Sequence, residues 1–329
     1  MPAPGGLAMT QDQEPEHQEE EKEYHRPVLA GTVKELMAEV PVGVVVDATF
    51  GGGGHARELA ARLGRGYRIL GIDRDPEAVA RAAEVRRTEA MDIEVRSGNF
   101  AHLGEILAEA GVRAPVGVLF DFGVSSHHLD EPARGFSYRL EGPLDMRMDP
   151  STPITAADLV NGLPEPELAS LLRRLGEEPA AGRIAKAIVA KRPLRTTTEL
   201  AAVIEAATPR SGPRRRHPAR RTFQALRMAV NAELDAISSG VGQALELLAV
   251  NGRCITIAYH SLEDRLVKKL FREASNGCVC PPDMPVCGCG AEAHYRLLTR
   301  GVIRPQADEV ADNPRSRSAR LRAVERVAA

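Results

Sequence analysis

The most constraining feature of the sequence is an alternation of short apolar runs and helical segments between residues 44 and 121. The first run, VVV at 44–46, is too uniformly apolar for a strand with one solvent-exposed face, so it predicts a buried parallel strand. Further strands are expected at 68–72, 92–100 and 115–120. The alternation predicts an α/β fold with a doubly wound parallel sheet and a ligand at the carboxyl ends of its strands.

The alternation breaks after about residue 131, where short helical stretches are punctuated by proline and glycine without a strand signal. It resumes near residue 222, and we expect a helix at 221–249, a strand at 252–260, a helix at 261–274 and a closing antiparallel pair at 295–301 and 318–327. The predicted domains are therefore a discontinuous core of residues 25–131 and 222–329 with an inserted helical domain of residues 132–221.

Residues 1–24 are predicted to be a disordered tail, because the stretch TQDQEPEHQEEEKE is acidic and nearly devoid of apolar groups. Without it the net charge of -2 becomes basic. The 329 residues are 43% hydrophobic, which is enough for a core, and no apolar run approaches the roughly 20 residues that span a bilayer. With no export signal either, we expect a cytoplasmic protein without a membrane partner. The sequence does not determine the oligomeric state, and a homodimer stays open.

The stretch VVVDATFGGGGHA predicts a strand, a glycine turn and a helix that begins at His55. A cofactor approaches the main chain closely in loops of this kind, although glycines also serve tight packing. Asp73 lies about 20 residues further on, the spacing at which an acid holds ribose hydroxyls. Phe100 would lie beside an adenine, or else belong to the core. Together these residues predict an adenosine-containing cofactor, and nicotinamide-dependent enzymes share the layout.

Asp121 ends the fourth predicted strand in the segment DFGVSS. An acid in this place suits chemistry on an exocyclic amino group, because a carboxylate that accepts the amino hydrogens localises the nitrogen lone pair for attack on a methyl sulfonium. An oxidoreductase of this fold would need a proton donor such as a Tyr and Lys pair at helical spacing, which the sequence does not offer. We therefore interpret Asp121 as the catalytic residue.

Two further segments are basic or polar. PRSGPRRRHPARR carries six arginines, and it is either a solvated surface or a phosphate-binding stretch that attracts RNA. We predict RNA contacts for Arg214, Arg215, Arg216 and Arg221.

HSLEDR, at 260–265, either borders a base pocket or caps a helix through Ser261 and Asp264.

Four cysteines cluster in CVCPPDMPVCGC, as two close pairs joined by a short loop. This arrangement suits a structural Zn²⁺ held by Cys278, Cys280, Cys287 and Cys289, and the alternatives are a reduced surface loop or an adventitious disulfide. Cys254 stands alone in a predicted strand and is expected in the core.

Eight motifs in this order resemble the MraW (RsmH) methyltransferases: HRPVL, DATFGGGGHA, GIDRDP, DFGVSS, RGFSYRLEGPLDMRMDP, HPARRTFQALRMAVNAEL, HSLEDR and NPRSRSARLRA. The resemblance implies a Rossmann-like (class I) methyltransferase core with an inserted helical domain that helps to bind RNA. It implies S-adenosyl-L-methionine as cofactor, 16S rRNA of the small ribosomal subunit as partner, and N4 of one cytidine in the decoding region as the methylated atom.

The resemblance also implies a set of cofactor contacts, which fall on Gly53, Gly54, His55, Asp73, Phe100 and Asp121. A further contact, usually a glutamine, falls on His128, and Phe122 replaces a leucine where added bulk would affect stacking of the target base. The sequence leaves two rivals open: a nicotinamide-dependent oxidoreductase, and a non-catalytic ribosome-assembly factor that keeps the fold only to bind RNA.

Overall fold

The computed structural model describes residues 27–80, 82, 92–208, 217–277 and 293–327. Within these residues a seven-stranded sheet has the order β3-β2-β1-β4-β5-β7-β6. The first five strands in this order are parallel: β3 Ile93–Ser97, β2 Arg68–Asp73, β1 Val44–Asp47, β4 Gly117–Asp121 and β5 Arg253–Ala258. The other two, β7 Arg320–Arg326 and β6 Tyr295–Leu297, are antiparallel, which confirms the expected closing pair.

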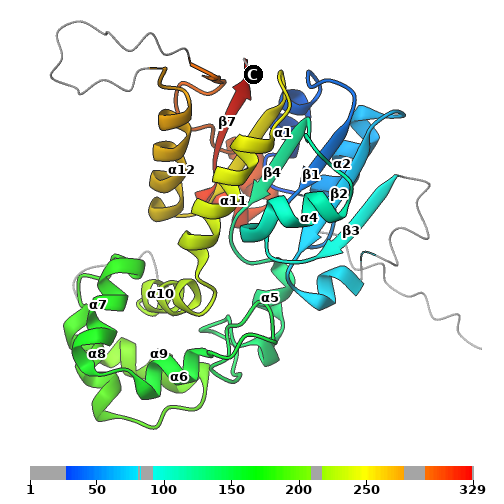
Figure 1. Cartoon of the computed structure of the whole chain (residues 1–329). Coiled ribbons are helices and arrows are strands. Elements are labelled where there is room, and N and C mark those ends of the chain that lie inside the picture. Colours follow the sequence, from blue (N-terminus) through cyan, green and yellow to red (C-terminus); the bar gives the residue numbers. More distant parts are fainter. Residues whose placement is uncertain (1–26, 81, 83–91, 209–216, 278–292, 328–329) are drawn as a thin grey trace, which may run out of the picture.

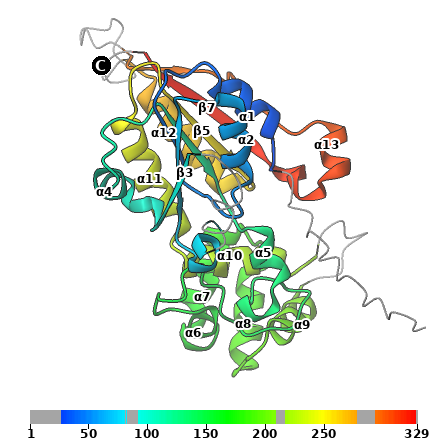
Figure 2. The same cartoon turned by 90° about the vertical axis from the view of Figure 1, so that its right-hand side faces the viewer.

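Helices cover both faces of the sheet, as the predicted doubly wound fold requires (Figures 1 and 2). One face packs against α1 Ala30–Met37 and α2 Gly54–Leu63, whose buried side chains include Met37 and Leu59. The other face packs against α4 Leu103–Glu109, α11 Glu233–Leu247 and α12 Ser261–Ala274. Cys254 is buried in this second core, as expected. None of the described helices is long and apolar enough to cross a membrane.

The predicted insertion is helical, and Figure 1 shows its helices packed together beside the sheet. It contains α6 Ala156–Gly162, α7 Glu165–Gly176, α8 Ala181–Ala190 and α9 Thr197–Ala207. The chain reaches these helices from β4 through the short α5 Ser126–Asp130. Their hydrophobic cluster also includes side chains of α10 Arg220–Val230, such as Phe223 and Leu226. The helical cluster thus extends to Val230, beyond the expected boundary at residue 221.

The single helix expected at 221–249 is wrong, because the chain forms α10 and α11 with a break between them. Ala232 adopts a left-handed conformation, with φ 45°, at this break. Asn231 stabilises it from the side, since its side chain donates to the Met146 carbonyl at 2.7 Å and accepts from the Met148 amide at 2.9 Å. The helical pattern continues through the break, so the pattern alone did not reveal it.

Candidate active site

The carboxyl ends of β1, β2 and β4 bring three acids to one edge of the sheet. Asp47 ends β1, Asp73 ends β2 and Asp121 ends β4. These parallel strands are neighbours in the order β2-β1-β4, so their last residues meet at the same edge. The structure therefore places Asp73 and Asp121 on opposite sides of the glycine loop that follows β1.

Two glycines of the loop have a backbone that other residues rarely adopt. Gly51 has φ 53° and Gly53 has φ 73°. A Cβ on Gly53 would lie 2.7 Å from the ring of Phe50, which also fills the space beside Gly71 of β2. The glycines therefore serve packing, because they leave room for a buried aromatic ring, and close approach of a ligand to the loop stays a prediction. Sequence analysis missed Phe50, although it lies directly before the glycines.

Asp73 holds the loop from the end of β2. Its Oδ2 accepts from the Gly51 amide at 2.7 Å, and its Oδ1 accepts from the Asp75 amide at 2.9 Å. Burial raises the pKa of Asp73 above its ordinary value, although these two amides oppose the shift. Each oxygen retains a lone pair, so the carboxylate can still accept ribose hydroxyls. The ribose contact stays a prediction.

Asp47, His55 and Asp121 form a cluster below the loop. Asp47 is fully buried, and burial raises its pKa to about 6 although the charge of His55 opposes the shift. His55 Nε2 lies 3.5 Å from Asp121 Oδ2. Burial lowers the pKa of His55, but the Asp121 and Asp47 carboxylates outweigh it and the net shift is upward. The cluster thus favours a protonated His55 between two acids.

Three buried atoms of this cluster make no hydrogen bond to any described residue. They are Asp47 Oδ2 and both ring nitrogens of His55. Buried polar atoms are nearly always paired in folded proteins. An amino acid moiety, with its ammonium and carboxylate groups, has the polar groups that this cluster lacks, so the residues fit a cofactor that carries one.

Asp121 is held at its backbone and at its side chain. Its amide donates to Thr49 Oγ1 at 2.7 Å, which ties the end of β4 to the loop after β1. Its Oδ1 accepts from the Tyr259 hydroxyl at 2.9 Å. The Asp121 side chain is still 23% exposed, so part of the carboxylate faces outward. Neither Thr49 nor Tyr259 was predicted as a site residue, although Thr49 lies two residues after β1 and Tyr259 lies directly after β5.

Two aromatic side chains expected near the site differ in burial. Phe100 is half-buried and packs with its ring centroid 5.5 Å from that of Phe120. Its contact with adenine stays a prediction. Phe122 is only 3% exposed and stacks on Phe120 in the core. Phe122 therefore does not itself offer an exposed face to a target base, and the effect of its bulk on base stacking stays a prediction.

His128 is buried in a different polar network. Its Nε2 lies 2.7 Å from Asp75 Oδ2, and its Nδ1 lies 3.1 Å from Ser125 Oγ. Arg134 also donates to Asp75, at 3.1 Å. Burial raises the pKa of Asp75, but these partners outweigh it and bring the value to about 2. Both ring nitrogens of His128 thus have protein partners. A cofactor contact of His128 would require one of these hydrogen bonds to break, and this contact stays a prediction.

A cavity of about 460 Å³ adjoins the end of β3. Asn99, Ala101 and His102 form one wall, and the first turns of α11 around Asp235 and Ser239 form the other. The cavity therefore lies on the side where the adenine is expected, and none of the three acids at the strand ends lines it.

The HSLEDR segment caps α12 by other residues than expected. His260 and Glu263 form the capping box, whereas Asp264 pairs with Arg322 at 2.7 Å and the Ser261 hydroxyl donates to Glu177. The alternative in which Ser261 and Asp264 satisfy the helix start is therefore wrong. Whether the segment also borders a base pocket stays a prediction.

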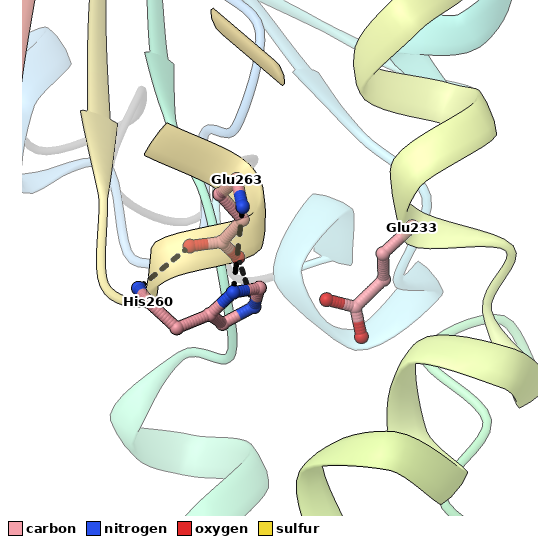
Figure 3. Close-up of side chains that lie close together, drawn as sticks. All are labelled: Glu233, His260 and Glu263. Atoms are coloured by element: carbon pink, nitrogen blue, oxygen red, sulfur yellow. Dashed lines mark hydrogen bonds and ion pairs between the residues drawn. The ribbon is translucent and has the colours of Figure 1, made fainter. Parts of the chain in front are cut away.

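Within the described residues, Glu233, His260 and Glu263 have ligand atoms within 4.8 Å of one another, and Figure 3 shows the Glu233 carboxylate directed toward the other two. Arg227 donates to both Glu233 oxygens at 2.8 Å and lies 3.9 Å from Glu263. Burial raises the pKa of Glu263, but His260 and Arg227 hold it below its ordinary value. The positive charge of Arg227 thus already compensates the negative charge of these two glutamates, and we assign no metal to them.

The remaining predicted contacts are only partly described. Arg221 lies exposed in the first turn of α10. Arg214, Arg215 and Arg216 lie outside the described residues, as do Cys278, Cys280, Cys287, Cys289 and the acidic tail. RNA binding by these arginines, zinc binding by the cysteines and disorder of the tail stay predictions.

The sheet order, with β7 antiparallel, together with a glycine loop after β1 and acids that end β2 and β4, defines a Rossmann-like methyltransferase. The comparisons agree with this class. The chain belongs to the MraW methylase family, whose model matches residues 22–327. The nicotinamide-dependent oxidoreductase that the glycine loop left open is therefore wrong.

Curated relatives are similar over nearly their whole length. A protein of Thermomicrobium roseum named ribosomal RNA small subunit methyltransferase H is 49% identical to this chain, and the match covers 92% of this chain and 94% of the relative. The corresponding protein of Geobacter sulfurreducens is 47% identical, covering 92% and 99%. A putative methyltransferase of Streptococcus mutans, solved in complex with SAH, has a TM-score of 0.41 and 10% identity over 90% of this chain and 96% of that one. This last likeness is too low to support an inference.

Proposed function

We propose that this protein uses S-adenosylmethionine to methylate N4 of one cytidine in the decoding region of 16S rRNA. The observation that carries the proposal is the Asp121 carboxylate, which is fixed at the end of β4 beside the glycine loop and is partly exposed. The names of the relatives support ribosomal RNA of the small subunit as the substrate. Such a substrate would place the protein in the cytoplasm.

The residues around the glycine loop suit the cofactor in its separate parts. Asp73 would accept the ribose hydroxyls, and the protonated His55 would pair with the carboxylate of the methionine moiety. Asp47 Oδ2 would accept from its ammonium group. Gly53 and Gly54 would allow the cofactor to approach the main chain, as helix α2 begins there. When bound, the cofactor supplies a methyl group on a positively charged sulfonium.

Asp121 would act on the other reactant. A cytosine amino group has its lone pair delocalised into the ring, so it is a weak nucleophile. The Asp121 carboxylate would accept a hydrogen bond from the amino group and so localise this lone pair. Holding the amino nitrogen and the methyl group in line would supply most of the remaining rate acceleration. The base must first leave its stack, at a cost of a few kcal/mol in paired RNA. No covalent enzyme intermediate is needed.

The helical insertion would dock the RNA. Arg221 is exposed at the start of α10, which packs both on the insertion and near the core. Guanidinium groups there would meet phosphate oxygens of RNA that reaches the catalytic edge. Binding by the insertion and chemistry at Asp121 would thus be separate tasks.

The test is methyl transfer to small ribosomal subunits from a strain that lacks the gene, with labelled S-adenosylmethionine and nucleoside analysis of the product. We expect label in N4-methylcytidine from 16S rRNA, and a rate of transfer that falls by orders of magnitude with Asp121→Asn. Asp130→Asn is the matched control, because this exposed carboxylate pairs with Arg315 at 2.7 Å outside the site. Label in another nucleoside would reject the N4 assignment. RNA binding without transfer would favour the non-catalytic assembly factor.

A further inference from the structure

Tyr259 lies beside Asp121 at the carboxyl end of the sheet. It follows β5, and Asp121 pairs with Ile257 in the register of β4 and β5, so the two residues lie at adjacent strand ends. The Tyr259 hydroxyl donates to Asp121 Oδ1 at 2.9 Å. The donor must be the phenol, since an ionised carboxylate has no hydrogen to give.

The position of Tyr259 is itself fixed from two sides. Its amide donates to Glu263 Oε2 at 2.7 Å, so the capping box of α12 holds its backbone. Its ring packs against Gly123, where an added Cβ would be 3.5 Å from Tyr259 Cδ2. Gly123 has φ 114°, a conformation that turns the chain away after Asp121 and that glycine tolerates best. The hydroxyl therefore reaches Asp121 from a rigid base.

The contact divides the two oxygens of the Asp121 carboxylate between different partners. Oδ1 faces the Tyr259 hydroxyl, and Oδ2 lies 3.5 Å from His55 Nε2. Burial and the nearby Asp121 charge raise the pKa of Tyr259 well above its ordinary value, so the hydroxyl keeps its proton. Without this donor the carboxylate could turn toward His55, which has no other hydrogen-bond partner among the described residues.

We propose that Tyr259 is a positioning residue for methyl transfer, whose hydroxyl holds the Asp121 carboxylate in the orientation that receives the target amino group. This inference rests on the proposed function, because it concerns the step that Asp121 performs. Tyr259 acts through Asp121 and does not itself need to touch the base. Its effect should consequently appear in turnover and not in the binding of either substrate.

The test is the Tyr259→Phe variant, which removes one oxygen and keeps the ring against Gly123. We expect kcat on small ribosomal subunits to fall by about 10- to 100-fold, while KM for the subunit and Kd for S-adenosylhomocysteine stay within about twofold. Tyr295→Phe is the matched control, because the Tyr295 hydroxyl is also buried and donates to the Leu245 carbonyl, away from the site. Its kcat should not change.

A double-mutant cycle separates positioning from a structural effect. In an Asp121→Asn background, Tyr259→Phe should cause little further loss of single-turnover rate, because the group that it orients is already removed. An undiminished second loss, a wild-type kcat for Tyr259→Phe, or a loss confined to KM would each overturn the inference.

A crystal structure of Tyr259→Phe tests the same inference without any activity. The Asp121 side chain should leave its wild-type orientation, and an unchanged orientation would overturn the inference. If the wild-type protein transfers no methyl group to small subunits, the proposed function fails, and the orientation of Asp121 in this crystal structure still decides the role of Tyr259.

Discussion

At the scale of single residues, each acid at the strand ends has a protein partner that defines what it can still do. Asp73 uses one lone pair of each oxygen for backbone amides, Asp121 is oriented by Tyr259, and Asp47 is buried beside His55. The three carboxylates therefore differ in burial, in hydrogen bonding and in the ligand group that they suit, although they lie at one edge of the sheet.

Removal of the Asp73 carboxylate should weaken cofactor binding. Asp73→Ala removes the expected acceptor of the ribose hydroxyls, and hydrogen bonds to a charged group contribute about 1.5 to 3 kcal/mol. Calorimetry with S-adenosylhomocysteine should therefore show Kd raised by about 10- to 150-fold. Asp92→Ala is the control, since Asp92 is exposed and lies just before β3. It is therefore at the amino ends of the parallel strands, whereas Asp73 is at their carboxyl ends. Equal affinities of Asp73→Ala and the wild type would disprove the ribose contact.

The buried Asp47 should make stability depend on pH. Its pKa is about 6 in the folded protein, against an ordinary value of 3.8, so folding favours its protonated form. Its contribution to the free energy of unfolding is fully present below pH 4 and is lost as pH rises through 6. The loss is about 3 kcal/mol, from about 1.36 kcal/mol for each pH unit of the shift.

Asp47→Asn removes this titration. Denaturant unfolding of the variant and the wild type at pH 4 and pH 7 measures the effect. The stability of the variant relative to the wild type should increase by about 2 to 2.5 kcal/mol between these two pH values, since only the wild type titrates there. Parallel pH profiles of the two proteins would show that Asp47 does not titrate as its burial implies.

At the scale of elements, the glycine loop is a packing unit formed by β1, β2 and Phe50. The strand, the glycines and the helix were predictable, because strand and helix differ in apolar spacing and glycine marks the turn. The position of the Phe50 ring under the loop was not predictable. A sequence shows which residues tolerate a turn, but it does not show that Gly71 of the neighbouring strand leaves room for this ring. The Asp121–Tyr259 contact escaped for the same reason, since it joins residues 138 apart in the chain.

Gly53 should be more sensitive to substitution than Gly111. Their φ angles are 73° and 69°, but a Cβ on Gly53 would meet Phe50 at 2.7 Å, whereas a Cβ on Gly111 would have no neighbour within 4 Å. Gly111→Ala should cost about 1 to 2 kcal/mol for the backbone conformation alone. Gly53→Ala should cost about 1 to 3 kcal/mol more for the displaced ring.

Denaturant unfolding of both alanine variants compares these costs. Equal losses of stability would show that Phe50 yields without cost and that the glycines of the loop serve the cofactor alone.

At the scale of the whole molecule, the insertion and the core meet at α12 and at the break between α10 and α11. Glu177, which follows α7, pairs with Arg265 of α12 at 2.6 Å, and Arg227 of α10 reaches Glu263. The presence of the insertion was predictable from the loss of strand signals after residue 131. Its end was not, because α10 continues the helical pattern into the core while its apolar face packs on the insertion.

RNA affinity should depend on salt through the arginines near α10. Replacing Arg214, Arg215, Arg216 and Arg221 with glutamine should lower the slope of log affinity against log salt by about 2 to 3, at roughly 0.7 for each phosphate that the variant no longer neutralises. Cofactor affinity should not change. The same substitution at the exposed Arg62, Arg65, Arg113 and Arg300 is the control for total charge. Similar slopes for both variants would contradict a specific RNA-binding stretch.

The central claim is that the carboxylate at the end of β4 directs methylation of one cytidine in 16S rRNA. Mass spectrometry of 16S rRNA from a strain that lacks the gene tests it most directly, with the wild-type gene or the Asp121→Asn variant restored. We predict that N4-methylcytidine disappears from the decoding region, returns with the wild type and stays absent with a normally folded Asp121→Asn protein. Unchanged N4-methylcytidine in the deletion strain, or full restoration by the variant, would contradict the account.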